Sequence, residues 1–488
     1  MNLTTATHIA QSALSTVSAE SAVVSRNISG VNDASFSQKI ANVITTFDGG
    51  SEVASVTNAQ NQALFGNVLS ATSASATQAA LSGGLTSLLN IIGEPGSDTS
   101  PAEKLSDLTN AIQQYEATPS NSSLAASAVN AAQSLASTLN NATNTVQQVR
   151  EQADTQMASS VASINSLLTQ FQGVNQQIVT GTATGADVTD LQDTRNSILT
   201  QLSQQIGITT TTNTNGDMSI YTDSGVALFQ GGTASTVTFQ PTQSYTAGTT
   251  GNAVYIDGIP VTGSSATMPI QSGALAGLAT LRDDVTVTYQ TQLDETANGL
   301  ISAFAETDPT NSSNTLAGLF TNGGSTALPT SSQLTGLAGN IQVNAAVDPS
   351  QGGDPEKLGN GINFNFNTSS QGSFDTQLEQ YLTNLSANQS FSSAGGIGTS
   401  NTLSGYAAAS VSWLDAEQQN VTSESAYQST LLSTSTTALS NTTGVNLDDE
   451  MSQMLDLENS YSASAKLLTT ISSMFADLAN AIDQATTA

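Results

Sequence analysis

The C-terminal run of residues 444–482 constrains the fold more than any other part of the chain. After Gly444 it contains neither glycine nor proline, so no residue in it breaks a helix. Apolar or small side chains recur at alternating spacings of four and three residues. This average of about 3.5 is typical of a coiled-coil seam, which requires a partner helix. The expected seam is Leu447, Met451, Met454, Tyr461, Ala465, Leu468, Phe475, Ala479 and Ile482, and Glu458 and Ser472 interrupt it.

The same helix carries a second apolar stripe on a neighbouring face, formed by Leu467, Ile471, Met474 and Leu478. One helix with two apolar faces needs more than one partner. At its start, Asp448, Asp449 and Glu450 fit the first turn of a helix, where the dipole favours acids. We therefore interpret this start as a helix signal without catalytic chemistry.

Residues 3–28 predict a possible partner at the other end of the chain. Apolar or small residues follow a strict heptad there: Leu3, Thr7, Ala10, Leu14, Val17, Ser21, Val24 and Ile28. The alternative is an ordinary amphipathic helix that folds onto its own domain. Because many seam positions are small, the helix buries little surface alone and needs its partners to be ordered. We expect it to end near Gly30 and the following turn to present Phe36.

Long helices are expected through the first half of the chain. The pattern predicts helices over 53–92, from the Ser100-Pro101 capping signal to about Ala117, over 124–180 and over 188–206. An unbroken helix over 124–180 would extend over about 80 Å at 1.5 Å per residue. The molecule should therefore be elongated.

The period changes at Gly207, where β-branched and polar residues begin to alternate between turn signals such as Asn215-Gly216. We expect about six short strands. Residues 213–217 superficially suggest a calcium loop, but the EF-hand order and its late glutamate are missing, so we prefer a hairpin turn. Helical periodicity returns over 275–304 and 403–439, with a Gly/Asn/Ser-rich irregular insertion between them.

The predicted fold is mainly α and elongated, with paired N- and C-terminal coiled-coil helices, a long-helix rod-like module and an inserted small β-domain. The terminal helical domain comprises residues 1–52 and 444–488. The long-helix module comprises 53–206, the returning helix 273–306 and 401–443. The β-domain covers 207–272 and the irregular insertion 307–400.

Composition excludes several classes of function. The chain has no cysteine, and its 8 basic residues face 38 acidic ones, giving a net charge of −30. A chain this acidic repels nucleic acid and anionic lipid, so we expect neither as a partner. No run of about 20 apolar residues exists to span a membrane. Met1 to Thr5 lack a basic segment before an apolar one, so we expect no cleaved signal peptide.

No catalytic constellation can be drawn from the sequence. His8 is the sole histidine and falls on a polar face of the first helix, where we expect it to be solvated. The carboxylate pairs Asp283-Asp284 and Asp448-Asp449 are adjacent on helices and point to different faces, which argues against an acid–base dyad. We therefore expect no enzyme, no metal site and no cofactor.

Four segments resemble the bacterial flagellar axial proteins, and most closely the hook-associated protein 1 family of hook–filament junction proteins. Asn27-Ile28-Ser29 with residues 34–37 resembles the family's NIS…AGYT segment. Residues 191–202, with the strand end at 228–231, resemble its LLDQRDQLVSEL helix. Residues 341–344, with Asp354-Pro355 and Leu358, are similar to its VNP…DP…L insertion. Residues 444–450 with Tyr461, Ala463, Ala465 and Lys466 are similar to its GVNLDEE…YQAAAR ending, although Ser35, Leu439 and Lys466 depart from the family pattern.

The resemblance implies a structural adaptor between hook and filament. It implies self-association into a ring or short tubular layer, contact with hook protein and hook-associated protein 3, and an export chaperone on the C-terminal helix. It also implies an extracellular location in the flagellum after type III export. The alternatives are another axial protein (hook-associated protein 3, hook protein or flagellin) or a secreted adhesin or carbohydrate-active enzyme.

We expect the assembly interface to combine apolar residues from both terminal helices and the turn after the first. Its members are Leu3, Ala10, Leu14, Val17, Val24, Ile28, Phe36, Leu447, Met451, Met454, Tyr461, Ala465, Leu468, Ile471, Phe475, Leu478 and Ile482.

Overall fold

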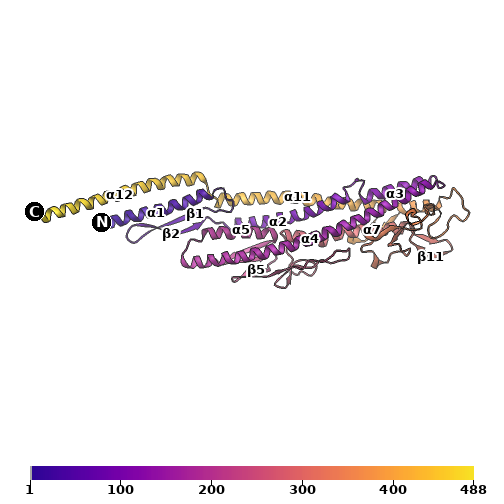
Figure 1. Cartoon of the computed structure of the whole chain (residues 1–488), viewed down its shortest axis with the longest axis horizontal. Helices are drawn as coiled ribbons and strands as arrows, with labels where there is room; N and C mark the ends of the chain where they lie inside the picture. The colour runs from indigo at the N-terminus through magenta and orange to yellow at the C-terminus, as the bar shows by residue number, and fades with distance from the viewer. Residues whose placement is uncertain (1–2, 488) are drawn as a thin grey trace.

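The computed structural model describes residues 3–487 and shows an elongated, mainly α-helical molecule with small strand sheets (Figure 1). Long helices form a rod along most of its length, and the two terminal helices extend together beyond one end of this rod. Both paired terminal helices and the inserted β-region are present. The expected fold class is therefore confirmed.

The terminal helices and a β-hairpin beside them form what we call the terminal unit. Helix α1 packs against α12 on one side and against the hairpin on another, and α1 and α12 run antiparallel (Figure 1). Hydroxyl groups join the hairpin to α1, since Thr16 Oγ1 donates to the Ser51 carbonyl at 2.7 Å. The elements of this unit are α1 (Leu3–Gly30), β1 (Lys39–Thr45), β2 (Ser51–Asn58) and α12 (Leu447–Thr487).

The hairpin corrects the prediction of a helix from residue 53. Residues 53–58 belong to β2, and the helix begins only at Gln62, after Asn61 caps it by accepting from the Leu64 amide. Val53 and Val56 satisfy a helical spacing, but they also belong to a segment rich in β-branched residues that includes β1 and favours strands. The turn between the strands contains Gly49, whose φ of +81° favours glycine.

The rod is built from long helices that share one continuous core. Its longest helix, α4, has 63 residues and extends about 95 Å at 1.5 Å per residue. The capping signal at Ser100 is confirmed, because its side chain accepts from the Glu103 amide and Pro101 opens the helix. The rod helices are α2 (Gln62–Ile92), α3 (Pro101–Glu116), α4 (Ser122–Thr184), α5 (Thr189–Gln205), α6 (Ala274–Thr280), α7 (Thr286–Ala303) and α11 (Leu403–Thr443).

The β-region lies against the rod as two small antiparallel sheets. Its first hairpin turns at Asn215-Gly216, as predicted, and Gly216 has a φ of +83°. Arg195 on α5 donates to the Gly216 carbonyl at 2.7 Å, which holds this turn against the helices. The strands are β3 (Ile208–Thr212), β4 (Met218–Thr222), β5 (Ala227–Gln230) and β6 (Thr233–Ala234) in one sheet, and β7 (Val237–Thr238), β8 (Tyr255–Ile256) and β9 (Ile259–Pro260) in the other.

A π-helical segment, Leu281–Val285, interrupts the helix that returns from the β-region. It turns Arg282 into the protein, where its guanidinium pairs with Asp154 on α4 at 2.6 Å and with Asp283 at 2.8 Å. The same guanidinium donates to the Asn252 carbonyl at 2.9 Å. Because Arg282 is fully buried, these contacts fix the loop at Asn252 onto the rod.

The irregular insertion between α7 and α11 is folded, and Glu306 is its central polar residue. The buried Glu306 carboxylate accepts from the Ile362 and Asn363 amides, both at 2.7 Å, and from the Tyr381 hydroxyl at 2.8 Å. The insertion contains β10 (Glu306–Asp308), β11 (Asn311–Leu316), β12 (Phe320–Asn322), η2 (Ser331–Gln333), α8 (Leu337–Asn340), β13 (Ile341–Val343), η3 (Pro349–Gln351), α9 (Lys357–Asn360), α10 (Thr376–Ser386), β14 (Asn388–Ser390), η4 (Ser393–Gly395) and β15 (Ser400–Thr402).

Candidate assembly surface

The apolar contact between α1 and α12 is a short seam. Val17 and Val24 of α1 enclose Leu457 of α12, and Ile28 and Met454 pack against them. Leu457 is the most buried of the α12 residues in this contact, at 8% exposure. The two ends of the chain are thus held together by a small hydrophobic cluster.

The buried line on α12 differs from the expected seam by a rotation of the helix. The buried residues of α12 lie at one heptad position, with spacings that are multiples of seven: Glu450, Leu457 and Ile471. Met454 and Leu468 are half-buried beside this line. The expected second stripe includes Ile471, and neither expected stripe includes Leu457. The two expected stripes occupy four of the seven heptad positions, so the sequence allowed two seams. The intramolecular contact selects the one that includes Leu457.

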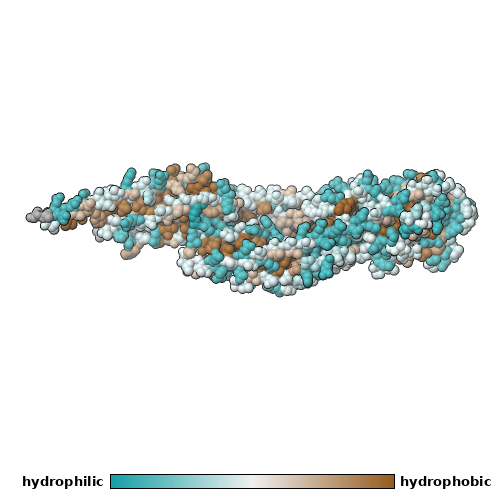
Figure 2. All heavy atoms as spheres, viewed as in Figure 1, coloured by the Kyte–Doolittle hydropathy of each residue, from teal (hydrophilic) through white to brown (hydrophobic). Residues whose placement is uncertain are grey.

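Most of the remaining apolar residues of α12 are exposed in a single copy. Most of them flank the buried line or, like Leu478, continue it, so the helix has one broad apolar face and α1 covers only its middle, whereas Leu455 lies on the opposite side of the helix. Hydrophobic residues gather at the start of α12 (Figure 2). The exposed residues are Leu447, Met451, Leu455, Tyr461, Leu467, Met474, Phe475, Leu478 and Ile482.

The predicted interface residues therefore separate into two groups. The first group is buried or half-buried in a single copy: Leu3, Ala10, Leu14, Val17, Val24, Ile28, Phe36, Met454, Ala465, Leu468 and Ile471. Those left uncovered are Leu447, Met451, Tyr461, Phe475, Leu478 and Ile482. The first group stabilises the terminal unit, and the second is accessible to another chain.

The hairpin adds exposed apolar residues that the sequence reasoning missed. Ile40, Val43 and Ile44 of β1 are exposed, and Phe47 at the turn is fully exposed, at 106%. A two-stranded hairpin is only marginally stable without a covering layer. The enrichment in β-branched residues on both sides of the Asp48-Gly49-Gly50 turn was the signal that could have identified it.

A buried polar residue, Asn27, joins the three parts of the terminal unit. Its amide donates to the Lys39 carbonyl and to Glu450 Oε1, both at 2.9 Å, and its carbonyl accepts from the Lys39 amide at 2.8 Å. Gln38 donates to the same Glu450 oxygen at 2.8 Å. Glu450 therefore has a structural task at the start of α12, in addition to its favourable place in the helix dipole.

The other candidate sites give no indication of chemistry. His8 is exposed, and it lines a hollow between α1 and the hairpin together with the exposed Glu52. Glu116, Asp375 and Glu379 place carboxylate oxygens within 4.8 Å of one another, but exposed acids commonly gather without a ligand. Across residues 3–487, no helix is long and apolar enough to cross a bilayer.

Comparison with protein families identifies two matching segments. Residues 85–343 match the family described as the flagellar hook-associated protein FlgK helical domain. Residues 438–481 match the C-terminal family of the flagellar basal body rod proteins FlgEFG. The first match spans more than half of the chain and covers most of the rod, and the second covers most of α12 and the end of α11.

Individual relatives agree with the first family. Flagellar hook-associated protein 1 of Escherichia coli K12 is 30% identical over 164 residues, which are 32% of this chain and 28% of that protein. The protein of the same name from Salmonella typhimurium is 29% identical over 152 residues, 31% of this chain and 26% of that protein. The matched segments thus span less than a third of these relatives. The flagellar hook junction protein FlgK from Burkholderia pseudomallei aligns with a TM-score of 0.43 and 22% identity, covering 53% of this chain and 47% of that one.

Proposed function

This chain belongs to the flagellar hook-associated protein FlgK family, and on that premise we propose that it is a structural adaptor at the junction between hook and filament. The match over residues 85–343 supports this role over that of a rod or hook protein. The C-terminal match does not separate these classes, because it belongs to a family of rod proteins. The role we propose is mechanical rather than enzymatic.

The observation that carries the mechanism is the uncovered apolar face of α12. In one copy α1 covers only the middle of this face, and Met474 and Leu478 are about half exposed. Burying one such side chain between subunits stabilises an assembly by about 1.5–3 kcal/mol. Because the contact repeats in every subunit, these residues together can hold a ring or a short tubular layer.

The partners we propose follow from the family and from this surface. The adaptor would associate with further copies of itself, with hook protein on one side and with hook-associated protein 3 on the other. An export chaperone would cover α12 before assembly, since uncovered apolar faces promote aggregation. We propose that the assembled protein lies in the extracellular part of the flagellum.

A pair of variants on α12 tests whether the uncovered face carries assembly. Met474→Asp places a charge on this face, whereas Ser473→Asp places the same charge on the exposed neighbouring residue, away from the apolar flank. We expect Met474→Asp to abolish incorporation into flagella and Ser473→Asp to leave it intact, with both chains exported and folded. Equal incorporation of the two variants would exclude this face as an assembly surface.

A further inference from the structure

The contact between the terminal unit and the rod differs in kind from the contacts inside each of them. The rod has one large hydrophobic core, and the terminal unit has its own small cluster around Leu457. The rod core includes no residue of the terminal unit among residues 3–487. Two short segments, 59–61 and 444–446, join the units covalently. Some other contact must set the direction of one unit relative to the other.

Polar groups at the start of α5 supply this contact, and Asp193 is at its centre. The Lys39 ammonium pairs with the Asp193 carboxylate, and both side chains are buried or nearly so. Asn58 Nδ2 donates to the same carboxylate at 3.0 Å, and the Ser37 amide donates to it at 3.3 Å. Three residues of the terminal unit thus converge on one side chain of the rod.

The first turn of α5 offers further acceptors beside Asp193. The Thr189 carbonyl accepts from Asn58 Nδ2 at 3.0 Å and from the Lys39 ammonium at 3.4 Å. Arg26 of α1 pairs with Asp187 at 2.8 Å and with Asp190 at 2.9 Å. Partial burial opposes ionisation of Asp187, but hydrogen bonds from Arg26 and Thr189 outweigh it and lower the pKa of the carboxyl.

Lys39 is held from the terminal unit as well as from the rod. Asn27 contacts both its amide and its carbonyl, and its ammonium lies 4.5 Å from the centre of the Phe36 ring. The preceding residue, Gln38, donates its backbone amide to the Thr443 carbonyl at the end of α11, which belongs to the rod, and its side-chain amide to Glu450 of α12. Movement at Lys39 would therefore be transmitted to α1, to the hairpin and to α12 together.

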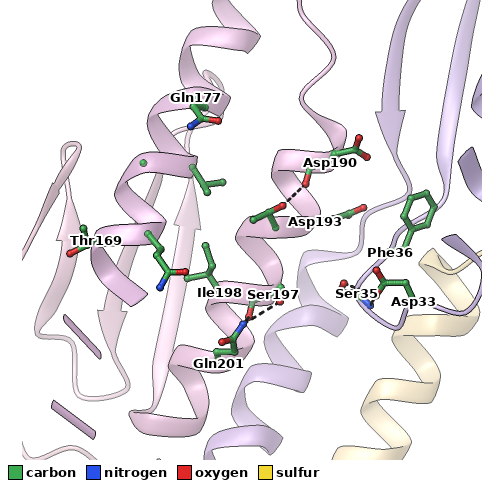
Figure 3. A pocket seen from close by; sticks show the side chains of 14 residues that line it. Asp33, Ser35, Phe36, Thr169, Gln177, Asp190, Asp193, Ser197, Ile198 and Gln201 are labelled. Carbon is green, nitrogen blue, oxygen red and sulfur yellow. Dashed lines mark hydrogen bonds between the residues drawn. The ribbon is translucent and has the colours of Figure 1, made fainter. Parts of the chain in front are cut away.

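A hollow beside this joint shows that little apolar packing reinforces it. The loop with Asp33 and Phe36 faces α4 and α5 across a cavity of about 600 Å³ (Figure 3). On the rod side the hollow is lined by residues such as Gln177 and Ile198, and Asp193 stands at its edge near the loop. The polar contacts at Asp193 therefore carry the connection on this side.

We propose that Asp193 is a positioning residue, which fixes the direction of the terminal unit on the rod through Lys39, Asn58 and Ser37. Without its carboxylate, the buried Lys39 ammonium loses its short ion pair and keeps only a 3.8 Å contact with the exposed Asp190, so the two short connecting segments can act as a pivot. As far as it concerns assembly, this inference rests on the proposed function, because a tubular layer requires every copy to present its terminal helices at the same angle.

Two spin labels can test the joint directly, because the chain contains no cysteine of its own. Ser18→Cys on α1 and Gln176→Cys on α4 are both exposed and report the distance between the units. We expect one narrow distance distribution in the otherwise unchanged full-length chain. Asp193→Ala and Lys39→Met should each abolish that narrow peak. Asp107→Ala, which removes an ion pair with Lys104 on α3, should leave it unchanged.

A second label pair separates loss of the joint from loss of the fold. Ser127→Cys and Gln176→Cys both lie on α4, so their distance stays narrow as long as the rod is intact. If Asp193→Ala also broadens the distance distribution within α4, the rod itself is disturbed. The milder variant Asn58→Ala is then compared with the unchanged chain in place of Asp193→Ala. A broad distribution between the units in the unchanged chain, or a narrow one in both joint variants, would overturn the proposal. Neither outcome depends on whether the protein acts at the hook–filament junction.

Discussion

The seam between α1 and α12 makes a quantitative prediction through Leu457→Ala. Leu457 is 8% exposed and packs against Val17 and Val24. Truncating a buried leucine costs about 2–5 kcal/mol, and we expect about 2–3 kcal/mol here because the cluster is small and open along its flanks. The opening equilibrium of the terminal unit should therefore rise about 30- to 150-fold, since each 1.36 kcal/mol is a factor of ten.

Native-state hydrogen exchange measures this opening through the amides of α1, with the amides of α4 as an internal reference. Leu455→Ala is the matched control, because it is the same substitution on the same helix at a residue that is 60% exposed. We expect it to change the opening free energy by less than about 0.5 kcal/mol. Equal acceleration of α1 exchange by the two variants would refute the packing argument and the placement of Leu457 on the seam.

Three further substitutions test other parts of the structure. Gly30→Ala would place a Cβ 2.5 Å from the Phe36 ring, so it should lower the stability of the terminal unit by about 1–3 kcal/mol. The control, Gly66→Ala on α2, meets no neighbouring atom and should be neutral or stabilising. Hydrogen exchange of the α1 amides and thermal unfolding distinguish the two variants. Arg282→Met leaves Asp154 without its buried cation, so it should lower the free energy of unfolding by about 3–5 kcal/mol in a denaturant titration. A loss as small as that expected for an exposed pair such as Lys104–Asp107 would contradict the conclusion that Arg282 fixes the loop at Asn252 onto the rod. Burial raises the pKa of Asp294 to about 6, although amide donors from Ala338 and Gly336 oppose the shift. The folded chain then holds the Asp294 proton more tightly than the unfolded chain does. The stabilisation from this proton is therefore complete below about pH 4 and is lost as the pH rises through 6, by at most about 3 kcal/mol. Asp294→Asn should remove this pH dependence of the unfolding free energy, and an unchanged pH profile in that variant would contradict the prediction.

The long helices of the rod could be predicted because their apolar spacing persists over many turns. The capping signal at Ser100 marks the start of α3, and the unbroken pattern after residue 124 agrees with α4. The start of the helix was placed too early because Val53 and Val56 fit the helical spacing, although their β-branched side chains also suit a strand. The turn of the hairpin at 39–58, with Gly49 at positive φ, carried the deciding information.

The sequence predicts that α12 is apolar and pairs with α1, but it does not predict which face of α12 makes the contact. The two apolar stripes at four heptad positions allow more than one seam, and only packing against Val17 and Val24 selects Leu457. The polar residues Asn27 and Asp193 could not be identified as contact residues, since hydrogen bonds between distant segments leave no periodic signal. Arg282 enters the core only because a π-helical turn changes the phase of its helix.

The central claim, an adaptor that joins hook to filament through its terminal helices, is tested most directly in cells that lack this chain. Electron microscopy of the cell surface and assay of flagellin in the medium should find hooks without filaments and flagellin released from the cells. Supplying the full chain should restore filaments. Cells without the chain that still carry filaments on their hooks and swim normally would contradict the account.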